Sequence, residues 1–518
     1  MVCVNTASLA YYATLFHSLI ATVVGQAVGS DPLQFTSSGN PILSDGSWYS
    51  ADPAPLVVNS TLYIVTGQDT AAADENSFAM PQWGLFSSES PDPQGSDWTL
   101  YPDIGDPNTI FSWAAAGTAY ASQIVEGQDG KYYLYVSITQ ADSPNNDPFA
   151  VGVAVSDLPT GPYTDAHPAG PIISQSIPSP GNSIQNIDPT VMVDDDGRVY
   201  IYFGTFGTLL GYELESDMVT VKGSVVEVTS LTGYFEAPWL MKRGETYYMI
   251  YAANNVSPDA VCTPTSYHAC QAYGTASSPL GPWTFQGVIL PIVSSTTSHA
   301  GAVSYDNKWY LVYHTADAKD GGHFRRSVAL DELTWDDSAT PPKMKQVNQT
   351  WAPQPDPEPT RNIAPRASAT SDGETPVQYW IKALNDGVVR VNPLPPDMWC
   401  SYNGEASPAS TALTYTWDQD VQLNGVRMIL FSDQPAGSNI GVPPPASWYV
   451  EYLDSDASWT RVANATAYPV DVTDSPEEVS FNVVTTSAIR ATLLASGDGS
   501  QYGGVGIKEW EALAPEAQ

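Results

Sequence analysis

The feature that most constrains this chain is a local pattern that recurs five times between residue 40 and about residue 350. Each copy has an acidic or Pro-containing turn, an apolar strand, a Gly- or Asn-containing turn and an aromatic-rich strand. The copies are DPAPLVVNSTLYIVTG (52–67), ASQIVEGQDGKYYLYVS (121–137), DPTVMVDDDGRVYIYFG (188–204), APWLMKRGETYYMIYAA (237–253) and GAVSYDNKWYLVYHT (301–315). Five related hairpins at a regular spacing predict a five-bladed β-propeller, because such repeats bury their apolar faces only against one another.

Length and composition predict an all-β chain with more than one domain. The 518 residues exceed one ordinary core, and 39 Gly, 43 Pro and 29 Tyr with short apolar runs favour strands and turns. The Pro-rich stretch 352–365 has no periodic pattern of apolar residues, which indicates a linker. Short alternating strands follow it. We therefore expect a propeller over 28–351 and an antiparallel β-sandwich over 366–518.

The charge of the chain excludes one class of partner. The formal net charge is -37, with 19 Lys and Arg against 56 Asp and Glu. A polyanion would be repelled across most of such a surface, so we expect no nucleic-acid partner. A neutral polymer such as a polysaccharide would not meet this barrier.

The N-terminus carries an apolar stretch over residues 7–28, followed by small residues and then by polar chain. This pattern predicts a signal peptide over 1–27 that ends near Ala27, and hence a secreted, extracellular protein. The absence of Lys and Arg before the stretch leaves an N-terminal anchor as the alternative. No other segment is long and apolar enough to span a bilayer, so we expect no membrane association, and we expect a monomer.

The cysteines agree with an oxidising compartment. Cys262 and Cys270 bracket a seven-residue loop, and we predict that they form a disulfide. Cys3 would leave with the signal peptide, and Cys400 is interpreted as a buried thiol. Four glycosylation sequons also agree with secretion: Asn59, Asn255, Asn348 and Asn464.

Three carboxylates occupy similar places within the repeats. Asp52 and Asp188 each precede a Pro and an apolar strand, and Glu236 lies in the sequence FEAPW. An Asp-Pro pair can simply begin a strand, but three such positions in one repeat are harder to explain in that way. We expect the three to meet near the central cavity, where desolvation would raise the pKa of Glu236. By contrast, the adjacent acids of 194–196 are interpreted as hairpin-turn residues rather than metal ligands.

These motifs, together with the segments VGVAVSDLPTGPY (151–163) and YGTASSPLGPWTFQG (273–287), resemble glycoside hydrolase family 43 over roughly residues 40–350. The resemblance implies a five-bladed propeller and inverting hydrolysis of arabinofuranosyl or xylosyl linkages in plant cell-wall polysaccharides such as arabinoxylan or arabinan. It further implies that Asp52 is the general base and Glu236 the general acid. Asp188 would orient the acid and modulate its pKa.

Two further positions follow from the same resemblance. His299 matches a histidine that faces the axis beside a calcium ion or a water, and the alternative is a hydrogen-bonded His that begins a strand. No cofactor is required, and any metal would be a structural calcium that the imidazole contacts directly or through water. Arg326 resembles a fifth-blade arginine that reaches the sugar or the acid, with Arg325 as the alternative.

The C-terminal region contains ALNDG (383–387), TSAIRATL (486–493) and GGVGIKEWEAL (503–513), which resemble the discoidin, or coagulation factor 5/8 type C, fold. That fold often binds carbohydrate. Four tryptophans could form a sugar platform or fill the core of the sandwich: Trp399, Trp417, Trp448 and Trp459.

The expected function is therefore the release of α-L-arabinofuranosyl or β-xylosyl units. An arabinanase or galactanase of the same fold is one alternative, and it would differ in having an open groove instead of a closed pocket. A non-catalytic carbohydrate-binding propeller is another. Three placed carboxylates argue against this second alternative, because a binding protein needs no acid, base and modulator together.

Overall fold

The computed structural model describes residues 31–143, 147–178, 184–254, 261–262, 268–294, 297–351, 361–373, 379–389, 397–402 and 407–515. Nearly all regular structure in them is strand, with one short helix, α1 (Pro107–Ile110), and two 3-10 turns, η1 (Ala364–Arg366) and η2 (Ile381–Leu384). The predicted signal peptide and most of the predicted linker lie outside these ranges. Among the helices described, none has the length and apolar character needed to cross a bilayer.

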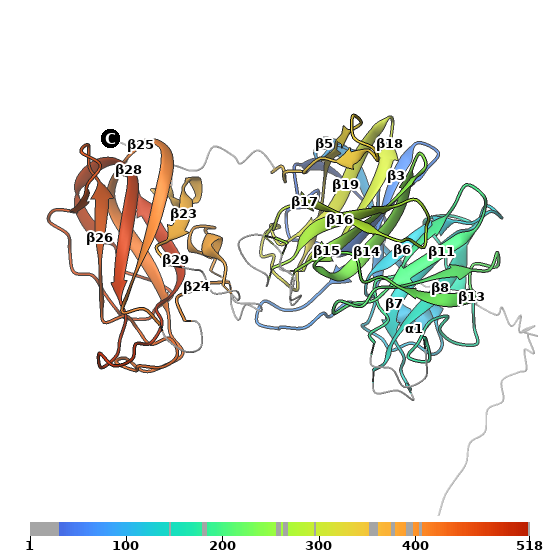
Figure 1. Cartoon of the computed structure of the whole chain (residues 1–518), viewed down its shortest axis with the longest axis horizontal. Coiled ribbons are helices and arrows are strands. Elements are labelled where there is room, and N and C mark those ends of the chain that lie inside the picture. Colours follow the sequence, from blue (N-terminus) through green and yellow to red (C-terminus); the bar gives the residue numbers. More distant parts are fainter. Residues whose placement is uncertain are drawn as a thin grey trace, which may run out of the picture.

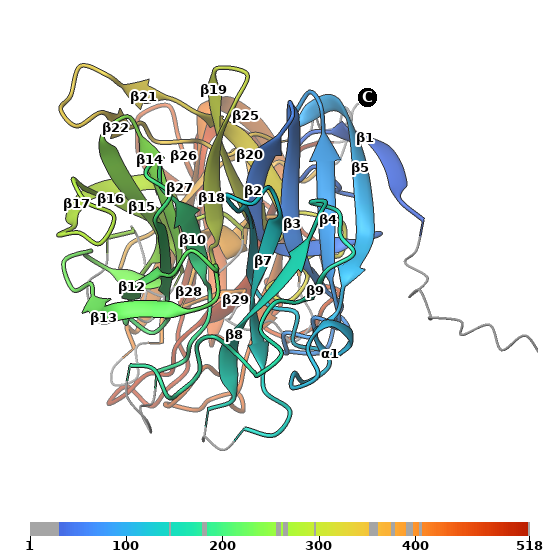
Figure 2. The ribbon, with the colours of Figure 1, turned by 90° about the vertical axis from the view of Figure 1, so that its right-hand side faces the viewer.

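Five antiparallel sheets form the blades of a propeller, which confirms the predicted fold class (Figures 1 and 2). Blade 1 contains β1 (Leu33–Ser38), β2 (Tyr49–Val58), β3 (Thr61–Asp69), β4 (Trp83–Ser88) and β5 (Gln94–Gly105); blade 2 contains β6 (Ser122–Glu126), β7 (Tyr132–Thr139), β8 (Phe149–Ser156) and β9 (Thr164–Asp165). Blade 3 contains β10 (Thr190–Val193), β11 (Val199–Phe203), β12 (Leu210–Leu214) and β13 (Val221–Glu227); blade 4 contains β14 (Tyr234–Arg243), β15 (Thr246–Ala253), β16 (Cys270–Ala276) and β17 (Thr284–Leu290). Blade 5 contains β18 (Ala300–Tyr305), β19 (Lys308–Thr315) and β20 (Ser327–Leu333), and a hairpin of β21 (Trp335–Asp336) and β22 (Lys343–Met344) follows it.

The blades stack face to face in a closed ring. The first strands of successive blades, β2, β6, β10, β14 and β18, contact one another in order, and β18 contacts β2 again. Every residue of β11 (VYIYF) and β16 (CQAYGTA) is buried, because neighbouring blades cover both faces of a middle strand. The outer strand β13 (VKGSVVE) is largely exposed and carries charges, which protects this sheet edge from further pairing.

The tight hairpins form where the sequence predicts them, with one shift. Asn59 and Ser60 have φ of 47° and 62°, and Asp306 and Asn307 have 44° and 62°, the left-handed conformation of type I′ turns. In blade 4, however, Arg243 pairs with Thr246. The turn residues there lie one position later than the predicted Arg243-Gly244, because the hairpin register keeps Arg243 within β14.

The ring closes by hydrogen bonds between the start of the propeller and blade 5. The backbone N–H of Ile42 donates to Val328 in β20 (2.9 Å), and that of Ser50 donates to Arg326 (2.7 Å). The buried amide of Asn40 pairs with both backbone groups of Leu330, donating to its carbonyl at 2.9 Å and accepting from its N–H at 3.0 Å. A side-chain amide thus takes the place of a neighbouring strand.

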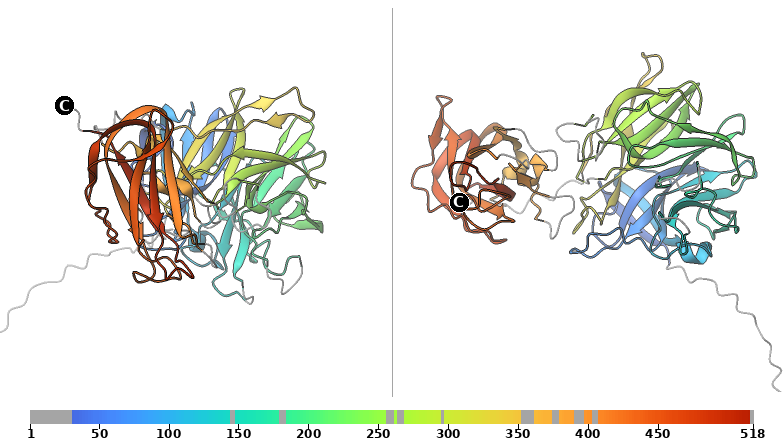
Figure 3. Two further views of the ribbon diagram at one scale, coloured as in Figure 1. Left: turned by 60° about the vertical axis from the view of Figure 1, so that its left-hand side comes forward. Right: turned by 60° about the horizontal axis from the view of Figure 1, so that its bottom comes forward.

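The C-terminal part is a β-sandwich, as predicted, and it lies to one side of the propeller (Figures 1 and 3). Its core buries Trp399, Trp417 and Trp448, whereas Trp459 is half-buried with the Arg490 guanidinium 4.4 Å from its ring centroid. Three of the four proposed platform residues are therefore core residues, and the discoidin type stays a prediction. The strands are β23 (Ser368–Ser371), β24 (Trp399–Cys400), β25 (Ser410–Phe431), β26 (Ser447–Leu453), β27 (Trp459–Arg461), β28 (Val479–Leu494) and β29 (Gly506–Leu513).

We expect Asn40→Ala to destabilise the propeller, because it leaves both backbone groups of Leu330 without their amide partner. The cost of such buried groups is about 2–4 kcal/mol, which corresponds to a decrease of roughly 5–10 °C in the melting temperature. Differential scanning calorimetry would measure it, with the exposed Asn108→Ala as the matched control. Equal melting temperatures for the two variants would contradict this role of Asn40.

Candidate active site

The three predicted carboxylates lie where the first strands of blades 1, 3 and 4 reach the propeller axis. Asp52, Asp188 and Ala237 each precede a Pro and each have a positive φ, of 53°, 57° and 56°. The register of β2 shifts between Ala51 and Ala54, and that of β14 shifts on both sides of Glu236. The repeated element is therefore a bulge, and in blades 1 and 4 the strand begins earlier than predicted. Pro cannot donate to the ladder and forces this irregularity, which turns the acidic side chain away from the sheet.

Asp52 is buried beside cationic and polar partners. Its Oδ1 accepts from Arg326 Nη1 at 2.8 Å and lies 3.7 Å from His299 Nδ1. Burial alone would raise the pKa of Asp52, but Arg326, His299 and His314 outweigh it and lower the pKa below the usual 3.8. Asp52 is consequently an ionised carboxylate at neutral and mildly acidic pH.

Arg326 is fixed by two carboxylates of blade 1. Its Nε donates to Asp69 Oδ2 at 2.8 Å and its Nη2 to Asp69 Oδ1 at 3.0 Å, a bidentate pair that leaves Nη1 for Asp52. The neighbouring Arg325 is half-buried and donates to the carbonyls of Asp320 and Ala72. The structure thus brings Arg326, and not Arg325, to the carboxylates.

His314 contacts Asp52 through one ring nitrogen. Its Nδ1 accepts from the backbone N–H of Asp52 at 3.1 Å, so the ring proton resides on Nε2, which lies 3.1 Å from the carbonyl of Thr297. Burial lowers the pKa of His314 to about 3, which keeps the imidazole neutral. The sequence alone did not identify His314 or Asp69, although Asp69 is the last residue of β3 and His314 is the last but one of β19.

Glu236 and Asp188 have the opposite electrostatic environment. Burial raises the pKa of Glu236 to about 7, the nearby Asp52 adds to this, and a hydrogen bond from Thr205 Oγ1 (2.7 Å) works against it. Burial and then the charge of Glu236 raise the pKa of Asp188, whose Oδ2 accepts from the N–H of Ala237 at 3.1 Å. Two close carboxyl groups without a cation of their own share a proton. The pair therefore remains partly protonated up to near neutrality.

His299 is buried, and its Nδ1 lies 3.7 Å from Asp52 Oδ1. Burial is the main reason why its pKa is lowered. Calcium requires several oxygen ligands, but the adjacent Asp52 oxygen is already held by Arg326, and the described residues contain no group of three or more His, Cys, Asp or Glu suited to a metal. This donor set does not fit a directly bound calcium, and we derive no chemical step through a metal.

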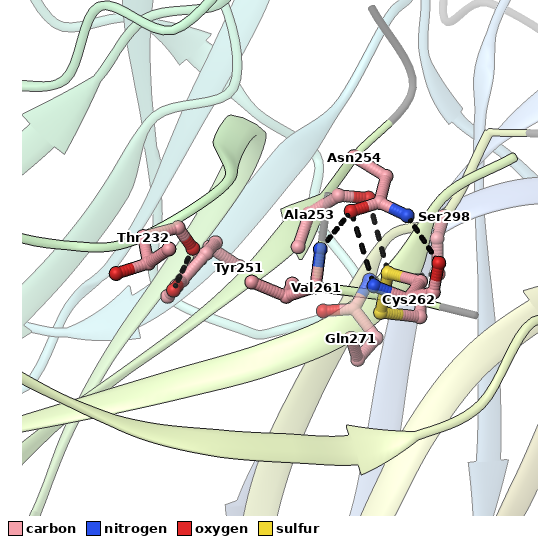
Figure 4. The surroundings of a disulfide bond; sticks show 9 residues. Thr232, Tyr251, Ala253, Asn254, Val261, Cys262, Gln271 and Ser298 are labelled. Carbon is pink, nitrogen blue, oxygen red and sulfur yellow. Dashed lines mark hydrogen bonds between the residues drawn. A yellow bond between two sulfur atoms is a disulfide. The ribbon is translucent and has the colours of Figure 1, made fainter. Parts of the chain in front are cut away.

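A disulfide lies close to Gln271 and Ser298 (Figure 4). Cys262 and Cys270 are bonded as predicted, and the buried Asn254 amide binds both N–H and carbonyl of Cys262. Gln271, which follows Cys270, contacts Ser298 Oγ at 2.8 Å. Ser298 directly precedes His299 in the chain. Cys400 is a buried free thiol in the sandwich, also as predicted.

The sandwich contacts the same part of the propeller. The ring of His268 in the propeller lies 5.5 Å from the ring of Trp380 in the C-terminal part. Ala269, which follows His268, packs on Ala237 beside Glu236. The accessory domain therefore contacts the propeller next to the carboxylates.

Aromatic side chains surround the carboxylates in two groups. Phe235 and Trp239 are buried, and the Trp239 indole donates to the carbonyl of Ala302, so both serve packing. Phe78 is partly exposed, and its ring centroid lies 5.0 Å from the Arg326 guanidinium. An aromatic face beside the ionised carboxylate suits the C–H surface of a sugar ring.

The arrangement places one carboxylate that stays ionised near one carboxyl group that keeps its proton up to about pH 7. Such a pair performs hydrolysis in which one group activates water while the other protonates a leaving oxygen.

Comparison with known proteins identifies relatives of the propeller. Residues 38–341 match the family model described as Glycosyl hydrolases family 43. A xylosidase/arabinosidase of Bacteroides ovatus is 30% identical over 338 residues, which cover 56% of this chain and 92% of the relative. The crystal structure of a family 43 β-xylosidase/α-arabinofuranosidase from a compost metagenome, in complex with xylotriose, is 25% identical with a TM-score of 0.50 and covers 61% of this chain and 99% of its own. An arabinoxylan arabinofuranohydrolase from Bacillus subtilis is similar in fold over 92% of this chain and 98% of its own, with a TM-score of 0.50 at 20% identity.

Thr205→Val should raise the pKa of Glu236 above about 7, because the Thr205 hydroxyl stabilises the ionised form. The infrared band of the protonated carboxyl, identified by its loss in Glu236→Gln, would report the midpoint. Thr208→Val in the same loop is the matched control. A midpoint that stays or moves down in Thr205→Val would contradict this electrostatic account.

Proposed function

Since the chain belongs to glycosyl hydrolases family 43 and is a glycosidase, we propose that it releases α-L-arabinofuranosyl or β-xylosyl units from plant cell-wall polysaccharides such as arabinoxylan. The observation that carries the proposal is the opposite pKa shift of Asp52 and Glu236. The names of the xylosidase/arabinosidase relatives support this substrate class. The charge of -37 supports a neutral polymer over an anionic one.

The proposed reaction inverts the anomeric centre. Asp52 takes a proton from a water molecule, whose oxygen attacks the anomeric carbon from the face opposite the leaving group. Glu236 gives its proton to the glycosidic oxygen as the bond from the anomeric carbon to that oxygen breaks. Asp188 accepts a hydrogen bond from the Ala237 N–H, which fixes the backbone beside Glu236, and it shares a proton with the Glu236 carboxyl group. The products are the free sugar and the shortened or debranched chain.

We also propose that the enzyme is extracellular, because it contains a disulfide. The Cys262–Cys270 disulfide requires an oxidising compartment to persist. The arabinanase or galactanase alternative has weaker support, because a relative named as an extracellular endo-α-(1→5)-L-arabinanase matches 30% of this chain, whereas the xylosidase/arabinosidase relative matches 56%. A non-catalytic binding propeller is disfavoured, because burial of three carboxylates with opposed pKa shifts costs stability without serving binding.

We expect Glu236→Gln and Asp52→Asn each to lower kcat by about 100-fold or more on arabinoxylan and on nitrophenyl arabinofuranoside or xyloside. The exposed Glu245→Gln should keep activity within about twofold of the unmodified enzyme and controls for loss of a carboxylate. Proton NMR of the first product formed should show inverted configuration. Retained configuration would reject the proposed roles even if both variants were inactive.

The rate of hydrolysis should depend on pH through the protonation of Glu236 and the ionisation of Asp52. Glu236 is protonated below about 7 and loses its proton above that value, while Asp52 is ionised down to below its usual 3.8. We therefore expect kcat/KM to be highest in the acidic range between these limits and to fall tenfold for each pH unit well above about 7. A profile that stays flat to pH 9 would show that Glu236 does not act as the acid.

A further inference from the structure

One loop on the active-site face carries an exposed aromatic residue that packing does not explain. Residues 204–209 connect β11 to β12 in blade 3. The N–H of Gly204 donates to the carbonyl of Ile187 (2.8 Å), and the N–H of Gly207 donates to the carbonyl of Phe235 (3.1 Å). The loop is therefore fixed between the residue that precedes Asp188 and the residue that precedes Glu236.

Phe206 stands at the tip of this loop. Its side chain is 63% exposed, the highest exposed fraction among the large apolar residues described. Its φ of 51° lies in the left-handed region that favours glycine, and Gly204 and Gly207 on either side also have positive φ. A single exposed apolar residue is common, but here a bulky ring is held in a strained backbone conformation at the active-site face.

The position of Phe206 relates it to Glu236. Thr205, the preceding residue, donates to Glu236 Oε2 at 2.7 Å, which leaves Oε1 to carry the proton toward a substrate. The ring of Phe206 rests edge-on against Phe235, with centroids 5.3 Å apart. Phe206 thus flanks the proton donor, whereas Phe78 lies over Arg326 near Asp52.

We propose that Phe206 is the binding platform for the sugar residue on the leaving side of the cleaved bond. This inference rests on the proposed function, in which Glu236 protonates the glycosidic oxygen. The leaving sugar must then lie next to Glu236, while the attacking water lies next to Asp52. A neutral pentose or hexose ring presents a C–H face that packs on an aromatic ring, and Phe206 offers such a ring to solvent.

The test compares substrates that differ only in the leaving group. Phe206→Ala and Phe206→Trp would be assayed on an arabinoxylan-derived trisaccharide and on the glycosyl fluoride of the same released sugar, whose leaving group is a single atom. We expect Phe206→Ala to lower kcat/KM on the trisaccharide by tenfold or more, mainly through KM, and to change the rate on the fluoride less than twofold. Phe206→Trp should keep the trisaccharide rate within about threefold.

Leu158→Ala is the matched control, because Leu158 is 57% exposed in a turn of blade 2. It should change neither rate. Equal losses on both substrates, or no loss in Phe206→Ala, would overturn the platform. If the unmodified enzyme hydrolyses neither substrate, the proposed function fails by itself. Calorimetric titration with the trisaccharide then decides the inference, since Phe206→Ala must weaken binding at least fivefold and unchanged binding would reject it.

Discussion

A buried guanidinium between two carboxylates is the interaction on which both the ring and the site depend. Arg326 precedes the last strand of blade 5 and binds Asp69 and Asp52 of blade 1. A buried ion pair that loses one partner costs about 3–5 kcal/mol, so blades 1 and 5 must meet in the register that joins these three side chains. The contact that closes the circle is also the contact that keeps Asp52 ionised.

The carboxyl groups of the site differ in pKa because they have different neighbours. Asp52 has the Arg326 guanidinium and the imidazoles of His299 and His314 nearby, whereas Glu236 and Asp188 have each other, a hydroxyl and a backbone N–H. Arg326 is shared by Asp69 and Asp52, and Asp188 and the partly buried Glu236 have no ion-pair partner of their own among the residues described, so at least one of these two must keep a proton near neutrality. An ionised base and a protonated acid therefore coexist in one site.

Side-chain amides connect the blades where backbone pairing is absent. Gln123 of blade 2 binds both backbone groups of Val191 in blade 3, in the same way as Asn40 binds Leu330 in blade 5. On the other side of the site, the disulfide between Cys262 and Cys270 cross-links two segments of blade 4. The contact between His268 and Trp380 joins blade 4 to the sandwich. The rim is thus more constrained than surface loops usually are, which suits residues that must hold proton donors in place.

The sequence by itself determined the number of blades, the hairpin turns, the sandwich and the three carboxylates, because these depend on local patterns that repeat along the chain. It also predicted the disulfide, whereas the family resemblance left Arg325 and Arg326 as alternatives until the structure placed Arg326 at the carboxylates. It could not identify Asp69, His314, Thr205 or Phe206, since common residue types acquire a role only from their neighbours. Those neighbours come from distant segments: Asp69 meets Arg326 across 257 positions of the chain. Only the closed ring decided which carboxylate received the cation and which kept the proton, because a pKa depends on charges in space and not on their order in sequence.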